Sequence, residues 1–328
     1  MVCMPMLRSS QICLNECTCY HVISRCNRQL HLLGGDAQER AKRKALLLEQ
    51  LERLATHTAV GVAGFSIMDN HVHLLLKVDS ESAREWSARE VARRWLALHP
   101  PRDGYFKPVE VGDEHLAVLA SDADAIAAAR EKLMSISQFM KEMKQEVTQR
   151  INRMDETVGS VWAGRFKCKR VTDEAQLLTT LAYIDLNPFA AGVCETPEAG
   201  EHTSLAARLG GEQGAASTTK RTSRRSGAAP KQRSGLREQR GWWMTVGGGQ
   251  PGAARTRRAL MPGTTLTFGR YLNLLDAVAR LLRKGKRRLA VDTQPIAARL
   301  AVTPRAVAAT VRDWLDNGLP WDRVRVVR

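Results

Sequence analysis

Two apolar runs separated by a short polar step form the most informative pattern in the chain. The runs cover residues 60–68 and 71–78, and Asp69-Asn70 lies between them. Two apolar runs joined by two turn-prone residues are typical of a β-hairpin. The pattern therefore predicts two antiparallel strands in this part of the chain.

The second of these runs carries two histidines, His71 and His73, with Val72 between them. Residues i and i+2 of a strand point to the same face of a sheet, so the two imidazoles are expected side by side. Such a pair can bind one divalent metal ion. Two strand histidines that only form hydrogen bonds are the alternative interpretation.

The rest of the pattern predicts a small number of strands and helices around this hairpin. We expect a strand over 19–26, a helix from Ala37 to about His57 capped by Asp36, a helix over 82–98, one or two helices from about Asp122, a strand over 165–171, and a helix from Ala175 to about Leu186 that Asn187-Pro188 ends. Residues 79–120 are interpreted as an insertion. The core order of strand, helix, strand, strand, helix, strand, helix predicts an α+β, ferredoxin-like fold: an antiparallel sheet with helices on one face.

Composition changes near residue 210 and predicts three parts. Residues 1–210 form the first part, which holds the predicted α+β fold and the His-x-His strand. Residues 211–265 are rich in Gly, Ser, Thr and Arg and are interpreted as a basic low-complexity linker. Residues 266–328 are expected to form a small helical module, in which 294–315 fits both a helix-turn-helix and a plain two-helix hairpin.

The charge of the chain indicates its class of partner. Lys and Arg number 50 against 34 Asp and Glu, which gives a formal net charge of +16. Such a balance favours a polyanion, most often nucleic acid. No apolar run is long enough to cross a bilayer and no signal peptide is evident, so we expect a cytoplasmic, nucleoid-associated protein without a membrane partner. The odd number of cysteines, seven, together with the lack of a secretory signal argues against a disulfide framework, so we expect reduced thiols. A zinc site among the four cysteines over 13–26 is the alternative, but the paired CxxC spacing is missing there.

The last predicted helix adds a second group of polar residues. Tyr183 and Asn187 are four residues apart, which places them on one face of a helix. A tyrosine and a carboxamide together on a helix, in a chain that also carries a His-x-His strand, are not needed by a hydrophobic core. They indicate a reactive site.

Three stretches together resemble a known family. They are Asp69-Asn-His-Val-His-Leu-Leu-Leu, Trp162-Ala-Gly-Arg-Phe-Lys and Ala182-Tyr-Ile-Asp-Leu-Asn-Pro-Phe-Ala-Ala-Gly192. In this order they resemble the single-tyrosine HUH transposases, and most closely the REP-associated tyrosine transposase branch, over roughly 19–207. Residues 271–275 also resemble a segment found in longer members.

The resemblance implies a mechanism. His71, His73 and Asn187 would hold Mg²⁺ or Mn²⁺ against a phosphate of single-stranded or hairpin DNA. Tyr183 would attack that phosphate and form a 5′-phosphotyrosine intermediate, so that strands are cut and rejoined without ATP. The chain would then be a transposase, with endonuclease and strand-transfer activity.

The resemblance also implies which cations contact DNA. Arg165, Lys167 and Lys169 would hold phosphates beside the site. Arg25 and Arg28 would contact hairpin DNA, although solvated surface charge is an equal interpretation for these two. Some relatives are homodimers that exchange the tyrosine helix, and the sequence leaves the oligomeric state open.

One departure from the family favours a different function. Ala190 stands where the family commonly has an arginine after the tyrosine. A catalytically silent or domesticated, sequence-specific DNA-binding protein is therefore the main alternative. A replication-initiator or relaxase type of HUH enzyme is a further one, but the Tyr183-x-x-x-Asn187-Pro188 spacing argues against it.

Overall fold

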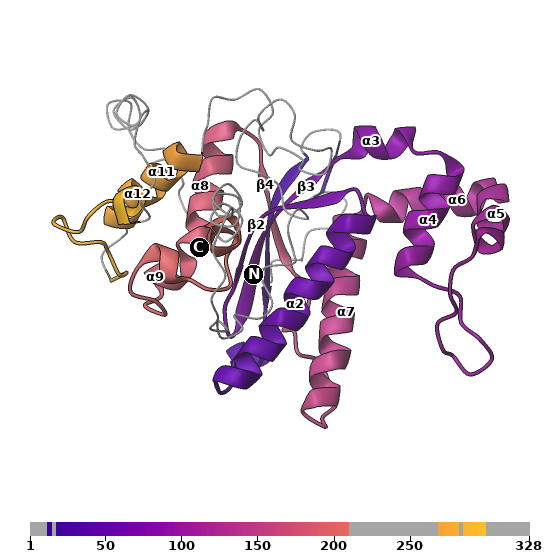
Figure 1. Cartoon of the computed structure of the whole chain (residues 1–328), viewed down its shortest axis with the longest axis horizontal. Helices are drawn as coiled ribbons and strands as arrows, with labels where there is room; N and C mark the ends of the chain where they lie inside the picture. The colour runs from indigo at the N-terminus through magenta and orange to yellow at the C-terminus, as the bar shows by residue number, and fades with distance from the viewer. Residues whose placement is uncertain (1–11, 15–17, 210–267, 282–284, 300–328) are drawn as a thin grey trace, which may run out of the picture. The chain divides into compact units, whose positions relative to one another are not determined.

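The computed structural model describes residues 12–14, 18–209, 268–281 and 285–299. The expected linker over 211–265 and most of the expected helix-turn-helix lie outside the described residues. The elements, labelled in Figure 1, are β1 (Cys19–Arg25), η1 (Asn27–Gln29), α2 (Ala37–His57), β2 (Val60–Ile67), β3 (His71–Val78), α3 (Ser80–Glu85), α4 (Ala88–Leu98), α5 (Asp113–Ser121), α6 (Ala123–Leu133), α7 (Ile136–Met154), β4 (Lys167–Val171), α8 (Glu174–Asp185), α9 (Asn187–Ala190), η2 (Pro197–Ala199), α11 (Phe268–Arg280) and α12 (Ile296–Arg299).

The four strands form one sheet in the order β2-β3-β1-β4. β1 and β4 are antiparallel, with Cys19 opposite Val171. β1 and β3 are also antiparallel, because the Cys26 N–H donates to the Asn70 carbonyl at 2.8 Å and the Val78 N–H donates to the Thr18 carbonyl at 2.8 Å. The predicted α+β class with an antiparallel sheet is confirmed.

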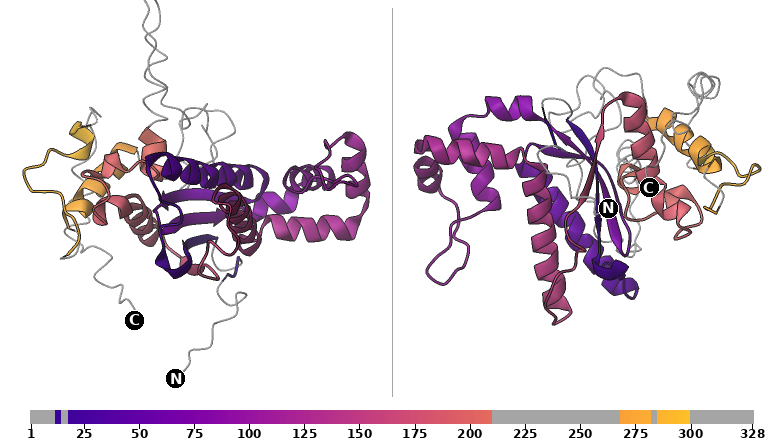
Figure 2. Two further views of the ribbon diagram at one scale, coloured as in Figure 1. Left: turned by 90° about the horizontal axis from the view of Figure 1, so that it is seen from below. Right: turned by 180° about the vertical axis from the view of Figure 1, so that it is seen from behind.

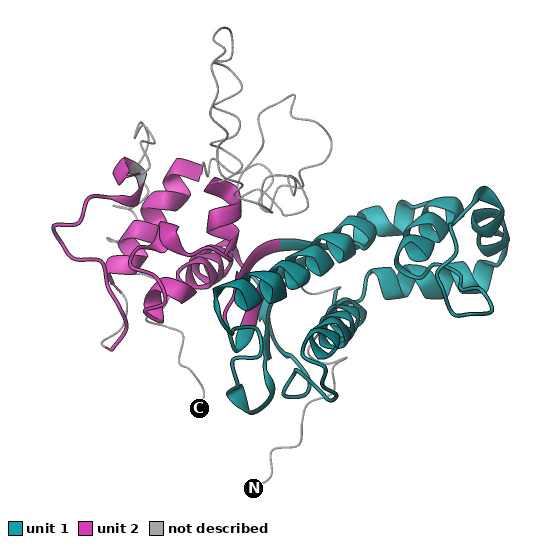
Figure 3. Ribbon diagram, turned by 60° about the horizontal axis from the view of Figure 1, so that its bottom comes forward, with its two compact units in different colours: residues 1–62, 69–71, 75–172 teal, residues 63–68, 72–74, 173–328 magenta. Residues whose placement is uncertain are grey.

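The described residues divide into two compact units (Figure 3). Unit 1 comprises residues 1–62, 69–71 and 75–172, and unit 2 comprises residues 63–68, 72–74 and 173–328. Strands β2 and β3 therefore contribute segments to both units.

Unit 1 is built on the pairing of β1 with β4 and on two long helices. α2 and α7 pack side by side and cover one face of these strands (Figure 2). The predicted start of α2 is confirmed, since one carboxylate oxygen of Asp36 accepts the N–H groups of Gln38 and Glu39, both at 2.8 Å. The core is made of fully buried side chains from β1, α2 and α7: Tyr20, Val22, Leu47, Leu51, Leu54, Met140, Met143 and Val147.

Between β3 and α7, unit 1 carries the group of helices α3 to α6, in which α4 packs on both α5 and α6. The prediction of a single helix over 82–98 is wrong, because two helices, α3 and α4, form there. Trp86, with ψ 135°, leaves the helical region, and Ser87 then caps α4 by accepting the Glu90 N–H at 3.2 Å. The helical pattern from Asp122 is two helices, because Ser135 caps α7.

Unit 2 consists mainly of helices, together with short segments of β2 and β3. The Ile67 N–H donates to the His202 carbonyl at 3.0 Å, and the Phe65 N–H donates to the Ser204 hydroxyl at 3.1 Å. A helical segment over 204–209 follows, and α8 and α11 pack on one another within this unit. None of the helices in the described ranges is long and apolar enough to cross a membrane.

Candidate active site and basic pocket

The two histidines lie where the hairpin pattern predicted them, at the start of β3. His73 is buried, with 3% of its surface exposed, and His71 is half-buried. The turn before them holds His71 in place, since its Nδ1 lies 2.6 Å from the Asn70 carboxamide oxygen. Strand alternation places both rings on one face of β3.

Asp69 fixes the turn from the other side. Its carboxylate lies 2.7 Å from the Lys44 ammonium and 3.2 Å from Arg40, both on α2. The hairpin turn is therefore tied to α2 by two ion pairs, one of which involves a buried lysine. This arrangement gives Asp69 a structural part in unit 1.

Tyr183 lies on α8 and is directed toward His73 within unit 2. The two ring centroids are 5.5 Å apart and the ring planes meet at 84°, an edge-to-face contact. Half of the tyrosine surface is exposed. The phenol is therefore accessible to a substrate, and one edge of the contact is the buried imidazole.

Asn187 follows the end of the tyrosine helix, as predicted, and also begins a further short helix. α8 ends at Asp185, Leu186 is its C-cap, and Asn187 is the first residue of the short helix α9. Asn187-Pro188 therefore opens a new helix, because proline is well tolerated in a first helical turn. Asn187 is half-buried, and its predicted part in metal binding stays a prediction.

Over the described residues, no three or more His, Cys, Asp and Glu side chains gather as they would around a metal ion. A set of two histidines and one asparagine contains only two residues of those types. The donor set of His71, His73 and Asn187 that the resemblance implies stays a prediction, and it would offer nitrogen and oxygen ligands.

Sequence reasoning missed Asp185, which is fully buried in unit 2 two residues after Tyr183. Its Oδ1 accepts the Ser204 hydroxyl at 2.5 Å and the Leu205 N–H at 2.9 Å. Its Oδ2 accepts the Arg208 guanidinium at 3.1 Å and the Tyr271 hydroxyl at 2.5 Å. The helix that carries Tyr183 is thus anchored by one carboxylate with four donors.

The groups around Asp185 are also buried. Arg208 further donates to the Ala63 carbonyl on β2 at 2.5 Å. Burial raises the pKa of Asp185, while Arg208 and the other donors oppose that rise. Burial, and then the nearby Asp185 charge, raise the pKa of Tyr271 well above its ordinary value, so Tyr271 keeps the proton it donates at neutral pH.

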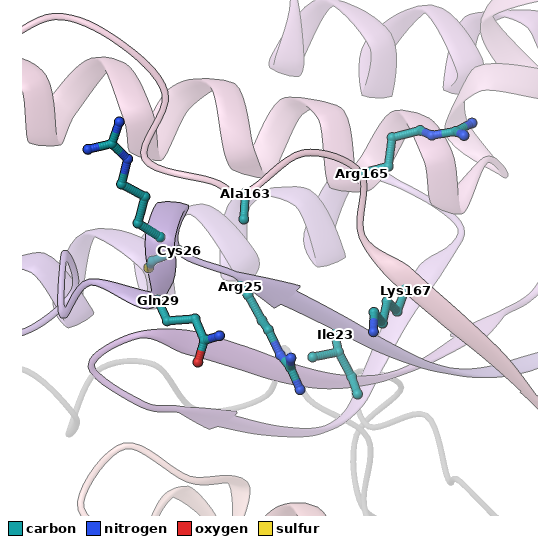
Figure 4. Close-up of a pocket in the computed structure, with 8 residues that line it drawn as sticks. Ile23, Arg25, Cys26, Gln29, Ala163, Arg165 and Lys167 are labelled. Atoms are coloured by element: carbon teal, nitrogen blue, oxygen red, sulfur yellow. The ribbon is translucent and has the colours of Figure 1, made fainter. Parts of the chain in front are cut away.

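A basic pocket opens in unit 1 beside the end of β1 (Figure 4). It has a volume of about 400 Å³. Its lining combines four cations with one carboxamide and three less polar side chains: Arg25, Arg28, Arg165, Lys167, Gln29, Ile23, Cys26 and Ala163. Figure 4 shows Gln29 and Lys167 on either side of Arg25, whereas Arg165 extends away from them.

Four of the five cations predicted to contact DNA therefore line one cavity. The fifth, Lys169, lies further along β4, opposite His21 on β1. The predicted alternation of cations holds for Lys167 and Lys169, which are both exposed on β4. The strand predicted to start at Arg165 starts two residues later, so Arg165 precedes it.

The Trp162-Ala-Gly-Arg165 stretch holds one wall of this pocket. The buried Trp162 indole donates to the Lys144 carbonyl on α7 at 3.1 Å, and the Ala163 N–H donates to the Arg25 carbonyl at 2.9 Å. Gly164 has φ +101°, a conformation that favours glycine. The turn into β4 thus depends on a fixed tryptophan and a left-handed glycine.

Two titratable groups in this region have shifted pKa values. Burial raises the pKa of Cys26 to about 11, so its sulfur is a neutral thiol in the pocket wall and not a nucleophile. Burial, and then the charge of Lys169, lower the pKa of His21 to about 4, so His21 is neutral at pH 7.

Comparison with solved structures gives a weak structural likeness. The chain is similar to a solved structure of a REP-associated tyrosine transposase bound to a REP hairpin, with 12% identity and a TM-score of 0.36. The match covers 61% of this chain and 82% of that one. A likeness of this size carries no functional conclusion for the chain.

Searches for related sequences found no match. No protein-family model matches the chain. No curated protein matches it either. The functional interpretation therefore depends on the residues of this chain.

Proposed function

We propose that the chain is a metal-dependent DNA strand transferase that cuts and rejoins single-stranded DNA beside hairpins through Tyr183. The observation that carries this proposal is the contact between the exposed Tyr183 ring and the buried His73 at 5.5 Å. His73 belongs to a His-x-His strand, and the net charge of +16 suits a DNA partner.

In the proposed reaction, the Tyr183 phenolic oxygen attacks the phosphorus of a DNA phosphodiester. The bond from phosphorus to the tyrosine oxygen forms, and the bond from phosphorus to the 3′-oxygen breaks. The phenolic proton passes to solvent, and the departing 3′-oxygen takes up a proton. A 3′-hydroxyl from another strand end reverses these steps, so that the strands are joined and the tyrosine is released.

The side chains near Tyr183 have separate parts in this scheme. The buried His73 ring orients the phenol through its edge-to-face contact. His71, His73 and Asn187 would hold Mg²⁺ or Mn²⁺, which polarises the phosphate when it is bound. Asp185 keeps α8 in place, because four donors bind its carboxylate two residues after the nucleophile.

A denaturing gel tests the proposal. The protein is mixed with Mn²⁺ and hairpin oligonucleotides that have randomised single-stranded flanks, each labelled at one end. A 5′-phosphotyrosine requires that the 3′-labelled strand shifts with the protein and that the 5′-labelled strand yields a short free product. Tyr183→Phe, His71→Ala and a chelator should each abolish both products.

Tyr105→Phe is the matched control, because Tyr105 is an exposed tyrosine on the loop between α4 and α5 of unit 1. It should cleave like the unchanged protein. Cleavage by Tyr183→Phe at the normal rate would overturn the assignment of the nucleophile.

The second candidate function is DNA binding without cleavage. Ala190 favours it, because this position at the end of α9 lacks the arginine that the resemblance implies. Hairpin binding that persists without any covalent product, and that Ala190→Arg does not convert to cleavage, would support it. Homodimer formation and a nucleoid-associated location stay predictions.

A further inference from the structure

We propose that the basic pocket of unit 1 holds one unpaired nucleotide of the DNA, with its phosphates on the cations and its base against Gln29 and Ile23. The inference rests on the proposed function only in taking DNA as the ligand. It adds a means by which the protein distinguishes one unpaired nucleotide from the rest of a strand.

The first argument is charge. Arg25, Arg28, Arg165 and Lys167 all line the pocket, and Arg25 and Lys167 lie close together in it while Arg165 extends away from them (Figure 4). Within the described ranges none of the four forms an ion pair with an acidic side chain. Like charges gathered at one cavity repel each other, and a bound anion relieves that repulsion. Arginine side chains bind phosphate oxygens through short, charge-assisted hydrogen bonds that are often bidentate.

The second argument is size and chemistry. A cavity of about 400 Å³ admits a nucleotide but not a duplex. Gln29 adds a carboxamide, which can both donate to and accept from the edge of a base. Ile23 and Ala163 add apolar surface. The apolar surface would not help to hold an inorganic anion, whereas it can pack against a base.

The third argument is the backbone that presents Gln29. Arg28 and Gln29 have φ angles of 49° and 57°, although neither is glycine. Consecutive left-handed residues are unfavourable and persist only where neighbouring contacts impose them. Hydrogen bonds on either side do so here: the Cys26 N–H donates to the Asn70 carbonyl and the Leu30 N–H donates to the Asn27 carbonyl, at 2.8 and 3.0 Å.

The pocket also lies next to the histidine strand within unit 1. The register set by Cys26 and Asn70 places Arg25 opposite His71 across β1 and β3. A nucleotide held by Arg25 would therefore lie one strand away from His71. Recognition of an unpaired nucleotide and the proposed chemistry would involve neighbouring residues of one sheet.

Calorimetric titration of the full chain at low salt tests the inference. The probes are the four deoxynucleoside 3′,5′-bisphosphates and deoxyribose 3′,5′-bisphosphate, which has the same phosphates and no base. At least one nucleotide should bind tenfold or more tightly than the abasic probe. Gln29→Ala should remove most of that preference and leave abasic binding unchanged.

Arg25→Gln should weaken binding of nucleotides and of the abasic probe alike, by tenfold or more. Arg153→Gln is the matched control for charge, because Arg153 is exposed near the end of α7, away from the lining of the pocket. It should change neither affinity by more than about twofold, as expected for a surface charge at a distance.

Equal binding of the abasic probe and all nucleotides would overturn the inference and leave a phosphate site only. A base preference that survives Gln29→Ala would also overturn it, because the base would then be read elsewhere. Tyr183→Phe should bind every probe normally. Absence of a covalent DNA product together with intact nucleotide binding would refute the strand-transfer proposal alone.

Discussion

Removal of the Tyr271 hydroxyl directly tests how Asp185 holds α8. The hydroxyl donates to Asp185 Oδ2 at 2.5 Å, and both residues are fully buried in unit 2. Tyr271→Phe removes this donor and changes little else, since phenylalanine keeps the ring. The carboxylate then loses one of its four donors in a place that water does not reach.

The expected cost follows from what remains at Asp185. A hydrogen bond to a charged group contributes about 1.5–3 kcal/mol to the free energy of unfolding. Arg208, Ser204 and the Leu205 N–H still bind the carboxylate. We therefore expect a loss of about 2 kcal/mol. Arg208→Ala should cost more, about 3–5 kcal/mol, because it leaves a buried carboxylate without its ionic partner.

Urea denaturation at pH 7, followed by tryptophan fluorescence, measures both values. Tyr105→Phe is the control, because 86% of Tyr105 is exposed, and its free energy of unfolding should change by less than about 0.5 kcal/mol. A loss below about 0.5 kcal/mol in Tyr271→Phe would refute the reasoning, since the hydroxyl would then contribute nothing to Asp185.

Two further predictions concern unit 1. Gly164→Ala should lower the free energy of unfolding by about 1–2 kcal/mol, because a Cβ there meets no atom and the cost is the left-handed backbone alone. Gly104 is equally open but lacks that conformation, so Gly104→Ala should cost less than about 0.5 kcal/mol. Equal effects of the two substitutions in urea denaturation would contradict the argument. The His21 ring should titrate near pH 4 by NMR, and Lys169→Gln should raise that midpoint. Because the unfolded chain takes up this proton more readily, the stability that neutral His21 contributes is complete above pH 6.5 and falls as the pH drops toward 4; a midpoint near 6.5 would argue against the burial of His21.

The sequence was most informative where local rules decide the structure. Asp36 predicts the start of α2 because its carboxylate satisfies N–H groups only two and three residues away. The hairpin follows in the same way from two apolar runs and a two-residue turn. In both cases the deciding contacts are close in sequence.

The prediction of a single helix over 82–98 was wrong, and here a residue distant in sequence stabilises the structure. The break between α3 and α4 is bridged by Arg130 of α6, whose guanidinium donates to the carbonyls of Ala83 and Trp86 at 2.5 and 2.7 Å. These carbonyls are satisfied without a continuous helix, although the apolar periodicity runs through the break. Local pattern carries no signal for a donor more than forty residues away.

The residues of the candidate site also fall into two groups, those that the sequence predicts and one that it does not. His71, His73 and Tyr183 stand out as residue types in motifs, and strand and helix assignments place them. Asp185 could not be distinguished from an ordinary exposed aspartate, because its partners follow 19 to 86 residues later. The only available signal was its position in the apolar Tyr183–Leu186 stretch.

The separation between Asp185 and Tyr271 has a consequence for the order of folding. A chain emerging from the ribosome presents α8 well before the residue that completes its anchor, since 86 positions separate the two partners. During that interval the carboxylate must stay hydrated or be satisfied by Arg208 and Ser204 alone, so unit 2 should close late. A fragment that stops at residue 209 would keep the helix of Tyr183 but lose Tyr271. We therefore expect such a fragment to hold its nucleophile less firmly than the complete chain does.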